Sequence, residues 1–214
     1  MMAVEKDKLR FNRLRQNLHL YLPKGQQRRV KLVNCDAARP LPRKRSQDHD
    51  RTFDAVLVDA PCSSERERLL RTIGRAGVHA RPRTGRDSSG SDSDSEDSSV
   101  LALPTETGVE WSMEKGVSNA RRQVELLRAA MRNAPNGTVV YSTCALSKIE
   151  NDEVVAEVLS EAPGWVCERQ RSSGFVEAIA TSLADVIGVE ETPLGWRVLP
   201  DRGGWGPIHW SVLR

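Results

Sequence analysis

The sequence has no apolar run of about 18 residues, so it predicts no membrane-spanning helix. No apolar segment follows the charges of its first residues, MMAVEKDKLR, which excludes a secretory signal there. Cysteine and histidine are scarce, with 4 of each, no CxxC pair occurs, and the histidines stand alone. This pattern disfavours both a disulfide scaffold and a structural zinc site. We therefore expect a reducing compartment, no membrane partner and no metal.

What the sequence does contain is enough apolar material for one packed domain. Its 214 residues are 38% hydrophobic, and the 15 glycines bring the apolar share to about 45%, near the globular norm. The net charge of +3 conceals an asymmetry, because residues 1–53 carry 14 Lys and Arg against 5 Asp and Glu. A basic N-terminal third suits a polyanion such as nucleic acid, and it equally suits a solvated helix face. Charge alone leaves both interpretations open.

Hydrophobic periodicity predicts alternating helices and strands. Apolar residues recur at helical spacing within residues 6–20, and Pro23 and Gly25 end that helix. The nearly continuous apolar run FDAVLV at residues 53–58 predicts a strand buried on both faces, which is typical of a parallel sheet. The other expected elements are strands at 30–33 and 138–141, helices at 118–133 and 150–159, and C-terminal strands at 196–199 and 209–213.

One segment breaks this alternation. Residues 81–99 contain 7 serines and 5 acidic residues and no hydrophobic residue. Such a segment cannot bury enough apolar surface to offset its ordering entropy. We therefore expect a disordered Ser- and acid-rich insertion over about residues 79–104.

The alternation of helices and buried strands predicts an α/β fold with an open, doubly wound sheet. In that architecture, ligands bind beyond the carboxyl ends of the strands. Three short polar segments, Asn34-Cys35-Asp36, Asp59-Ala60-Pro61-Cys62 and Ser142-Thr143-Cys144, each follow a predicted strand. We expect the functional site where these segments meet.

Two cysteines and one aspartate stand out in these segments. Asp59 and Cys62 end one strand, and Cys144 ends the strand reached by the next crossover helix. If the two strands are neighbours, about 4.8 Å apart, both thiols and the carboxylate face one cleft. The alternative is that both cysteines are small buried hydrophobic residues, as most free cysteines are.

Two longer stretches connect these residues to a known family. VLVDAPCSS (56–64) and VVYSTCALSKIENDEVV (139–155) resemble the two signature motifs of the Sun/Fmu-type, RsmB-like RNA cytosine-5 methyltransferases, in the same order and with a helix like ARRQVELLRAAM (120–131) between them. The closing VLPDRGGWGPIHWSVLR is similar to the C-terminal hairpin of the mitochondrial-type members. The resemblance covers nearly the whole chain apart from residues 72–110. It implies a Rossmann-like methyltransferase sheet, S-adenosyl-L-methionine as cofactor, rRNA or tRNA as substrate and a mitochondrial location.

The resemblance also implies a role for each residue of the expected site. Cys144 is the nucleophile that adds to C6 of cytosine and so makes C5 reactive toward a methyl group. Asp59 hydrogen-bonds the base at N3 and its amino group and stabilises the charge that develops. Cys62 assists the release of the product from Cys144. A thiolate at neutral pH requires a lowered pKa, which a helix N-terminus or a nearby basic residue could supply.

The cofactor residues implied by the resemblance are Glu5, for the ribose hydroxyls, Asp36, near the adenine, and Asp59, near the methionine moiety. The family's first strand and Gly-rich loop, resembling AxPGGK, would precede residue 3. We therefore expect residues 1–214 to form a partial catalytic domain without its first strand, which exposes the edges of the neighbouring strands. A degenerate relative of the family is the alternative.

The remaining features favour structural interpretations. We expect Cys35 and Cys167 to be structural and the tryptophans to pack in the core and the C-terminal hairpin. The basic runs 24–31 and 39–45 are either solvated loops or phosphate contacts. Two functions from different classes stay open: an RNA cytosine-5 methyltransferase, or a catalytically inactive relative that acts as an RNA-binding or ribosome-assembly scaffold with a partner protein.

Overall fold

The computed structural model describes residues 1–42, 52–64, 112–170, 178, 181–182, 188–200 and 206–214. The expected Ser- and acid-rich insertion lies outside these residues. In chain order, the elements are β1 (Met2–Val4), α1 (Lys8–Tyr21), α2 (Lys24–Gln27), β2 (Lys31–Val33), β3 (Ala55–Asp59), α4 (Met113–Asn133), β4 (Thr138–Thr143), the 3₁₀ turn η2 (Lys148–Glu150), α5 (Asp152–Ser160), the 3₁₀ turn η3 (Glu168–Gln170), β5 (Val189–Thr192), β6 (Gly195–Val198) and β7 (Ile208–Leu213). No described helix is long and apolar enough to cross a membrane.

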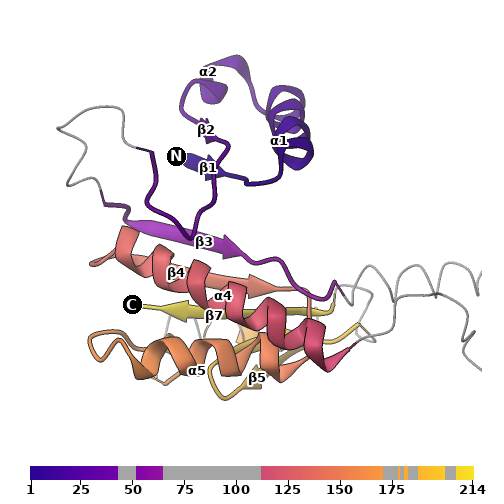
Figure 1. The fold of residues 1–214 in the computed structure, drawn as a ribbon, viewed down its shortest axis with the longest axis vertical. Coiled ribbons are helices and arrows are strands. Elements are labelled where there is room, and N and C mark those ends of the chain that lie inside the picture. The colour runs from indigo at the N-terminus through magenta and orange to yellow at the C-terminus, as the bar shows by residue number, and fades with distance from the viewer. Residues whose placement is uncertain (43–51, 65–111, 171–177, 179–180, 183–187, 201–205) are drawn as a thin grey trace, which may run out of the picture.

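The strands form two separate sheets, with the β1–β2 pair beyond the β3 edge of the larger sheet (Figure 1). β1 and β2 are parallel, and the five-stranded sheet has the order β3-β4-β7-β6-β5. Within it, β3 and β4 are parallel, and the pairs β4–β7, β7–β6 and β6–β5 are antiparallel. The α/β class and the parallel pairing of the first strands are confirmed, and the antiparallel hairpins make the larger sheet mixed.

The prediction that residues 53–58 form a strand buried on both faces was wrong. β3 alternates between exposed and half-buried residues, and the Leu57 side chain is 69% exposed. The physical reason is that Val56 and Val58 pack against the core on the helix-covered face, whereas Leu57 points to the opposite face. The apolar run in the sequence therefore does cover a strand, but one face of that strand lacks a covering layer.

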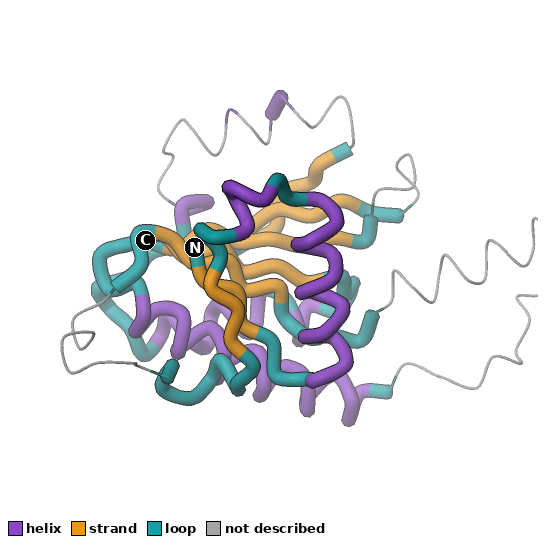
Figure 2. The backbone as a smooth tube through the Cα atoms, turned by 90° about the horizontal axis from the view of Figure 1, so that it is seen from above, coloured by secondary structure: helices purple, strands orange, loops and turns teal. Residues whose placement is uncertain are grey.

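Helices α4 and α5 cover one face of the five-stranded sheet, and the perpendicular view shows both along the same side (Figures 1 and 2). α4 presents Val124, Leu127 and Met131 to the core, where they meet β4 and the buried face of α5. α4 begins earlier than the expected residue 118, because the Ser112 hydroxyl caps it by accepting a hydrogen bond from the Lys115 amide at 3.2 Å.

The C-terminal strands complete the five-stranded sheet beyond β4. Trp196 and Trp210 lie opposite each other on β6 and β7, with ring centroids 6.3 Å apart and planes inclined by 19°. The expected packing role is confirmed for these two tryptophans. β5 was not predicted, because its sequence VEET is mostly polar. In the structure, its Glu190 forms an ion pair with Arg197 of β6 at 3.0 Å.

The N-terminal unit consists of β1, β2 and two helices. The Asp7 side chain caps α1 by accepting a hydrogen bond from the Arg10 amide at 2.8 Å, and the helix ends before Pro23, as predicted. The Asn34 side chain donates to the carbonyls of Glu5 and Lys6 at 2.7 and 3.0 Å, which ties the carboxyl end of β1 to that of β2.

Candidate functional site

The carboxyl ends of β3 and β4 lie side by side because the two strands are parallel and in register. Asp59 pairs with Ser142, and the Ala60 amide donates to the Ser142 carbonyl at 2.9 Å. The chain then leads from β3 into the segment 60–64 and from β4 directly to Cys144. The two cysteine-bearing segments therefore start from adjacent points at one edge of the sheet.

The structure brings the two cysteines into direct contact. The Sγ atoms of Cys62 and Cys144 are 2.9 Å apart, although the residues are separated by 82 positions in the chain. The Cys144 amide also points to the Cys62 sulfur at 3.4 Å. Asp59 is exposed at the end of β3, close enough for its charge to act on Cys144. The predicted meeting of two thiols and a carboxylate is thus present.

The thiols differ in acidity. The hydrogen bond from the Cys144 thiol lowers the pKa of Cys62 to about 7; burial opposes this shift, and the amides of Ser64 and Cys144 add to it. The pKa of Cys144 is raised, first by its hydrogen bond to the Cys62 sulfur and then by burial and the charges of Cys62 and Asp59. The acidifying group at this thiol pair is therefore the neighbouring thiol, and the source of a lowered pKa for the attacking cysteine stays a prediction.

A buried polar cluster that sequence reasoning missed lies beneath the thiols. Glu150 is fully buried, and its Oε2 atom accepts hydrogen bonds from the Ser63 amide, the Asn119 side chain and the Gln123 side chain at 3.0, 3.1 and 3.0 Å. Asn151 is also buried and contacts both neighbours of Cys144. The only signal in the sequence was that Glu150 and Asn151 lie within the second motif stretch, 139–155, where no role was assigned to them.

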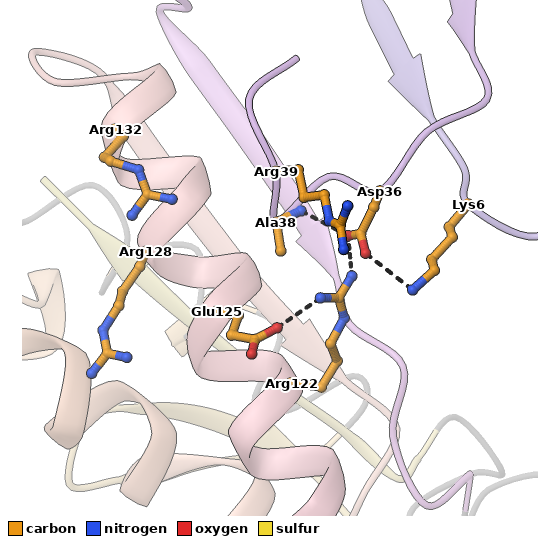
Figure 3. Close-up of a pocket in the computed structure, with 8 residues that line it drawn as sticks. All are labelled: Lys6, Asp36, Ala38, Arg39, Arg122, Glu125, Arg128 and Arg132. Carbon is orange, nitrogen blue, oxygen red and sulfur yellow. Dashed lines mark hydrogen bonds and ion pairs between the residues drawn. The ribbon is translucent and has the colours of Figure 1, made fainter. Parts of the chain in front are cut away.

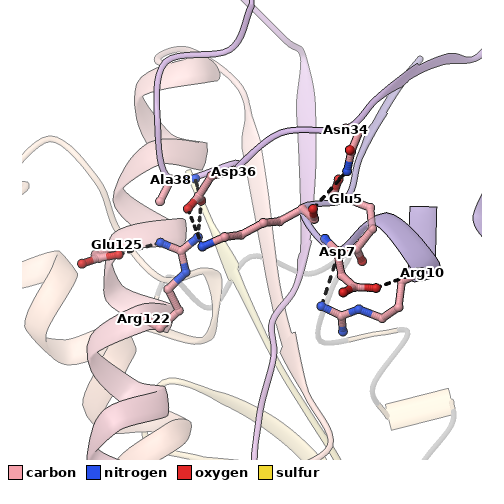
Figure 4. Close-up of polar contacts among 9 residues, drawn as sticks. Glu5, Asp7, Arg10, Asn34, Asp36, Ala38, Arg122 and Glu125 are labelled. Carbon is pink, nitrogen blue, oxygen red and sulfur yellow. Dashed lines mark hydrogen bonds and ion pairs between the residues drawn. The ribbon is translucent and has the colours of Figure 1, made fainter. Parts of the chain in front are cut away.

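Glu5 and Asp36 lie at the carboxyl ends of β1 and β2, as the expected cofactor positions require, but both carboxylates already have partners (Figure 4). Glu5 accepts from the Asp7 amide at 2.7 Å and pairs with Arg10 at 3.3 Å. Asp36 forms ion pairs with Lys6, at 3.0 Å, and with Arg122 of α4. Although burial raises the pKa of Asp36, the Arg122 and Lys6 partners hold it well below its usual range.

A pocket of about 500 Å³ opens beside Asp36 and is strongly basic (Figure 3). It lies between the segment that follows β2 and the face of α4 that carries Arg122. The lining residues are Lys6, Asp36, Ala38, Arg39, Arg122, Glu125, Arg128 and Arg132. On another face of α4, the Gln123 side chain donates to the Pro61 carbonyl at 2.8 Å. α4 therefore contributes to both the basic pocket and the segment that carries Cys62.

The other two cysteines lie away from the thiol pair. Cys167 is fully buried, and its thiol donates to the Leu194 carbonyl at 3.0 Å, so its structural role is confirmed. Burial raises the pKa of both Cys167 and Cys35. Within the described ranges, no three His, Cys, Asp or Glu side chains are grouped so as to hold a metal ion.

Comparison with known proteins agrees with the motifs. A family model described as 16S rRNA methyltransferase RsmB/F matches residues 105–202. The chain is 28% identical over 225 aligned positions to the mouse mitochondrial tRNA (cytosine(34)-C(5))-methyltransferase, covering 100% of this chain and 50% of the mouse protein. The zebrafish protein of the same name is 31% identical and aligns with 76% of this chain and 35% of its own length. The chain therefore spans half or less of the length of these relatives.

The solved structures show the fold. The crystal structure of NSun6 from Pyrococcus horikoshii with SFG matches all of this chain and 40% of its own, with a TM-score of 0.54 and 20% sequence identity. The Rossmann-like methyltransferase sheet expected from the resemblance is therefore confirmed.

Proposed function

The chain belongs to the Sun/Fmu-type, RsmB-like family of RNA cytosine-5 methyltransferases, and on this premise we propose that it methylates C5 of a cytosine in tRNA or rRNA through a covalent bond between Cys144 and C6. The observation that carries the proposal is the 2.9 Å contact between the Cys62 and Cys144 sulfurs. Small buried hydrophobic residues, the alternative interpretation, need no such contact and no acidified thiol.

The thiol pair suits the first chemical step. As the Cys144 sulfur bonds to C6, its proton passes to the Cys62 thiolate, for which the pKa of about 7 is well matched. The C5–C6 electron pair shifts toward C5, and Asp59 hydrogen-bonds the N3 and amino edge of the base. Cys62 thus serves as the proton acceptor that lets a thiol of raised pKa attack.

Release needs Cys62 as a base, so its thiol first gives the proton taken up during attack to water. The Cys62 thiolate then removes the C5 proton, the C5–H electron pair re-forms the C5–C6 double bond, and the C6–S bond breaks. The departing Cys144 thiolate takes that proton from Cys62, which restores the Cys144 thiol and the Cys62 thiolate. One cysteine attacks, and the other holds and moves the proton.

The methyl donor that fits is S-adenosylmethionine, and an analogue of it, SFG, is named with the archaeal NSun6 structure. Bound in the family's manner, it supplies the methyl group to C5. Glu5 and Asp36 fit by position, since a nucleoside offers hydroxyl and amino donors to two carboxylates at adjacent strand ends. Asp36 has to exchange a cationic partner for the ligand. We extend the mitochondrial location of the named relatives to this chain within the same proposal.

A second candidate function is favoured by one observation. The occupied carboxylates of Glu5 and Asp36 and the arginine-rich pocket suit a scaffold that binds RNA phosphates without methyl transfer, including one that acts in ribosome assembly with a partner protein. Such a protein binds RNA but forms no covalent adduct.

The test separates the two cysteines. Wild type, Cys144→Ala and Cys62→Ala proteins are incubated with pooled tRNA or rRNA and labelled S-adenosylmethionine at saturating concentration, so that weak cofactor binding does not limit the reaction. Methyl incorporation and covalent adducts are measured by denaturing electrophoresis. Cys144→Ala should give neither product nor adduct. Cys62→Ala should accumulate adduct, because without the Cys62 sulfur the largest cause of the raised Cys144 pKa is gone and attack can proceed, whereas release lacks its base.

Cys35→Ala is the control and should behave as wild type. An adduct with Cys144→Ala but not with Cys62→Ala would reverse the two roles. RNA binding without methylation or adduct in every protein would favour the scaffold.

A further inference from the structure

We propose that Glu150 and Asn151 are positioning residues that hold the two reactive cysteines in contact. The purpose of this role rests on the proposed function, whereas the contacts that carry it do not. The two residues are consecutive, at the junction of η2 and α5, and both are buried. One of them fixes the segment around Cys62 and the other the segment around Cys144.

Glu150 fixes the chain on both sides of Cys62. Its Oε2 atom accepts the amide of Ser63, the residue after the cysteine, at 3.0 Å. The Gln123 side chain, held on the same oxygen at 3.0 Å, donates its second proton to the carbonyl of Pro61, the residue before the cysteine, at 2.8 Å. Cys62 is therefore held between two anchored peptide groups.

Asn151 does the same for Cys144. Its Oδ1 atom accepts the Thr143 hydroxyl at 2.6 Å, and its Nδ2 group donates to the Ala145 carbonyl at 3.0 Å. These are the residues immediately before and after Cys144. Adjacent Cα atoms are about 3.8 Å apart, so two neighbouring residues fix the separation of the two cysteine segments.

A purely structural role for a buried carboxyl group is the competing explanation, because such a group needs hydrogen bonds wherever it lies. The two explanations predict opposite changes in the pKa of Cys62 when Glu150 is replaced. The negative charge of Glu150 by itself raises the pKa of Cys62, so removing only that charge lowers the pKa further. Loss of positioning separates the sulfurs, removes the thiol hydrogen bond and raises the pKa.

The experiment measures the rate of Cys62 alkylation by iodoacetamide against pH, with mass spectrometry to assign each cysteine. Wild type should titrate near 7. Glu150→Gln leaves a weaker, neutral acceptor for three donors and puts a buried NH2 group without an acceptor in place of the other carboxylate oxygen, so Cys62 should titrate closer to the ordinary thiol value of about 8.5. Glu153→Gln, an exposed change of the same charge on α5, is the matched control and should leave the Cys62 profile unchanged. A fall of the Cys62 pKa in Glu150→Gln would overturn the positioning role.

A second measurement follows contact directly. Diamide oxidises two adjacent thiols to a disulfide and is itself reduced, and the rate of Cys62–Cys144 disulfide formation reports their separation. Asn151→Asp keeps the acceptor for Thr143 but loses the donor to Ala145, so the rate should fall by roughly tenfold. An unchanged rate would contradict the proposal.

Folding is checked in the same samples, because buried Cys167 stays unreactive toward iodoacetamide only while the core is intact. If Glu150→Gln exposes Cys167, then Asn151→Asp decides the question alone. None of these measurements uses RNA or S-adenosylmethionine. A protein that fails to methylate RNA can therefore still show the positioning effect, and the reverse holds as well.

Discussion

At the scale of the residue, the sulfur of Cys62 depends on its neighbours for its character. It accepts from a thiol and from backbone amides, and these hydrogen bonds outweigh the opposing effect of burial on its pKa. The largest of these contributions comes from Cys144. Reactivity is therefore a property of the pair, and changing one cysteine changes the acidity of the other.

The first prediction concerns this dependence. Cys144→Ala removes the strongest hydrogen bond to the Cys62 sulfur, so the pKa of Cys62 should rise from about 7 toward the ordinary value. The alkylation rate of Cys62 at neutral pH should fall accordingly, as measured against pH with mass spectrometry. Cys35→Ala serves as the control. A Cys62 profile that does not move would mean that the sulfurs are not hydrogen-bonded in solution.

At the scale of the element, the α5 N-terminus joins the helical layer to the β5–β6 hairpin. Asp152, in the first turn of α5, accepts from the Thr192 hydroxyl and the Leu194 amide through its Oδ1 atom, both at 2.8 Å. The His209 ring of β7 lies 3.9 Å from the same oxygen. Burial raises the pKa of Asp152, but His209 and the two hydrogen bonds outweigh it, so the net pKa is lowered.

The second prediction follows from that shift. Asp152→Ala should reduce the free energy of unfolding at pH 7 by about 2 kcal/mol, since two donors lose a charged acceptor. A carboxyl group with a lowered folded-state pKa stabilises the protein above its unfolded pKa, about 3.9, and loses that contribution as pH falls through the folded value. The difference between wild type and Asp152→Ala in urea unfolding should therefore shrink below about pH 4.

The control for this prediction is Glu153→Ala, whose side chain is exposed on the same helix. It should leave the unfolding free energy nearly unchanged at both pH values. A wild-type to Asp152→Ala difference that stays constant from pH 7 down to pH 3 would show that packing, and not the ionised acceptor, provides the stabilisation.

The same elements show what the sequence could predict. The apolar run at 53–58 located β3, and the parallel pairing of β3 with β4 followed from the crossover, so the meeting of Cys62 and Cys144 was predictable. The exposure of Leu57 was not, because it depends on whether another layer packs on that face of the sheet. β5 was missed because its charges are neutralised only by partners on other elements.

The sequence predicted less about the candidate site than about the strands. Glu150 acts on residues 27 to 87 positions away, and no local pattern in a single sequence links a buried carboxyl group to such distant donors. For Asp36, the sequence predicted the position of the residue but not its partners. Its position at a strand end was predicted correctly, but its ion pair with Arg122, 86 positions away, appears only once α4 is placed over the sheet.

At the scale of the whole molecule, the candidate site is divided between two sheets. Glu5 and Asp36 belong to the β1–β2 unit, whereas Asp59 and both cysteines belong to the five-stranded sheet. No described strand hydrogen-bonds to both sheets. The partly buried Asp36–Arg122 ion pair is a side-chain link between them.

The last prediction is that the 214-residue chain binds S-adenosylmethionine weakly, with a dissociation constant in roughly the millimolar range or beyond. A ligand that contacts Glu5, Asp36 and Asp59 must hold the two sheets in one arrangement, and the free energy of that ordering reduces the observed affinity. It must also displace Lys6 or Arg122 from the Asp36 carboxylate. Isothermal titration calorimetry measures the affinity, with Asp36→Asn as the variant that should remove any residual binding. Micromolar affinity of the wild-type chain would show that the two sheets already form a competent cofactor site.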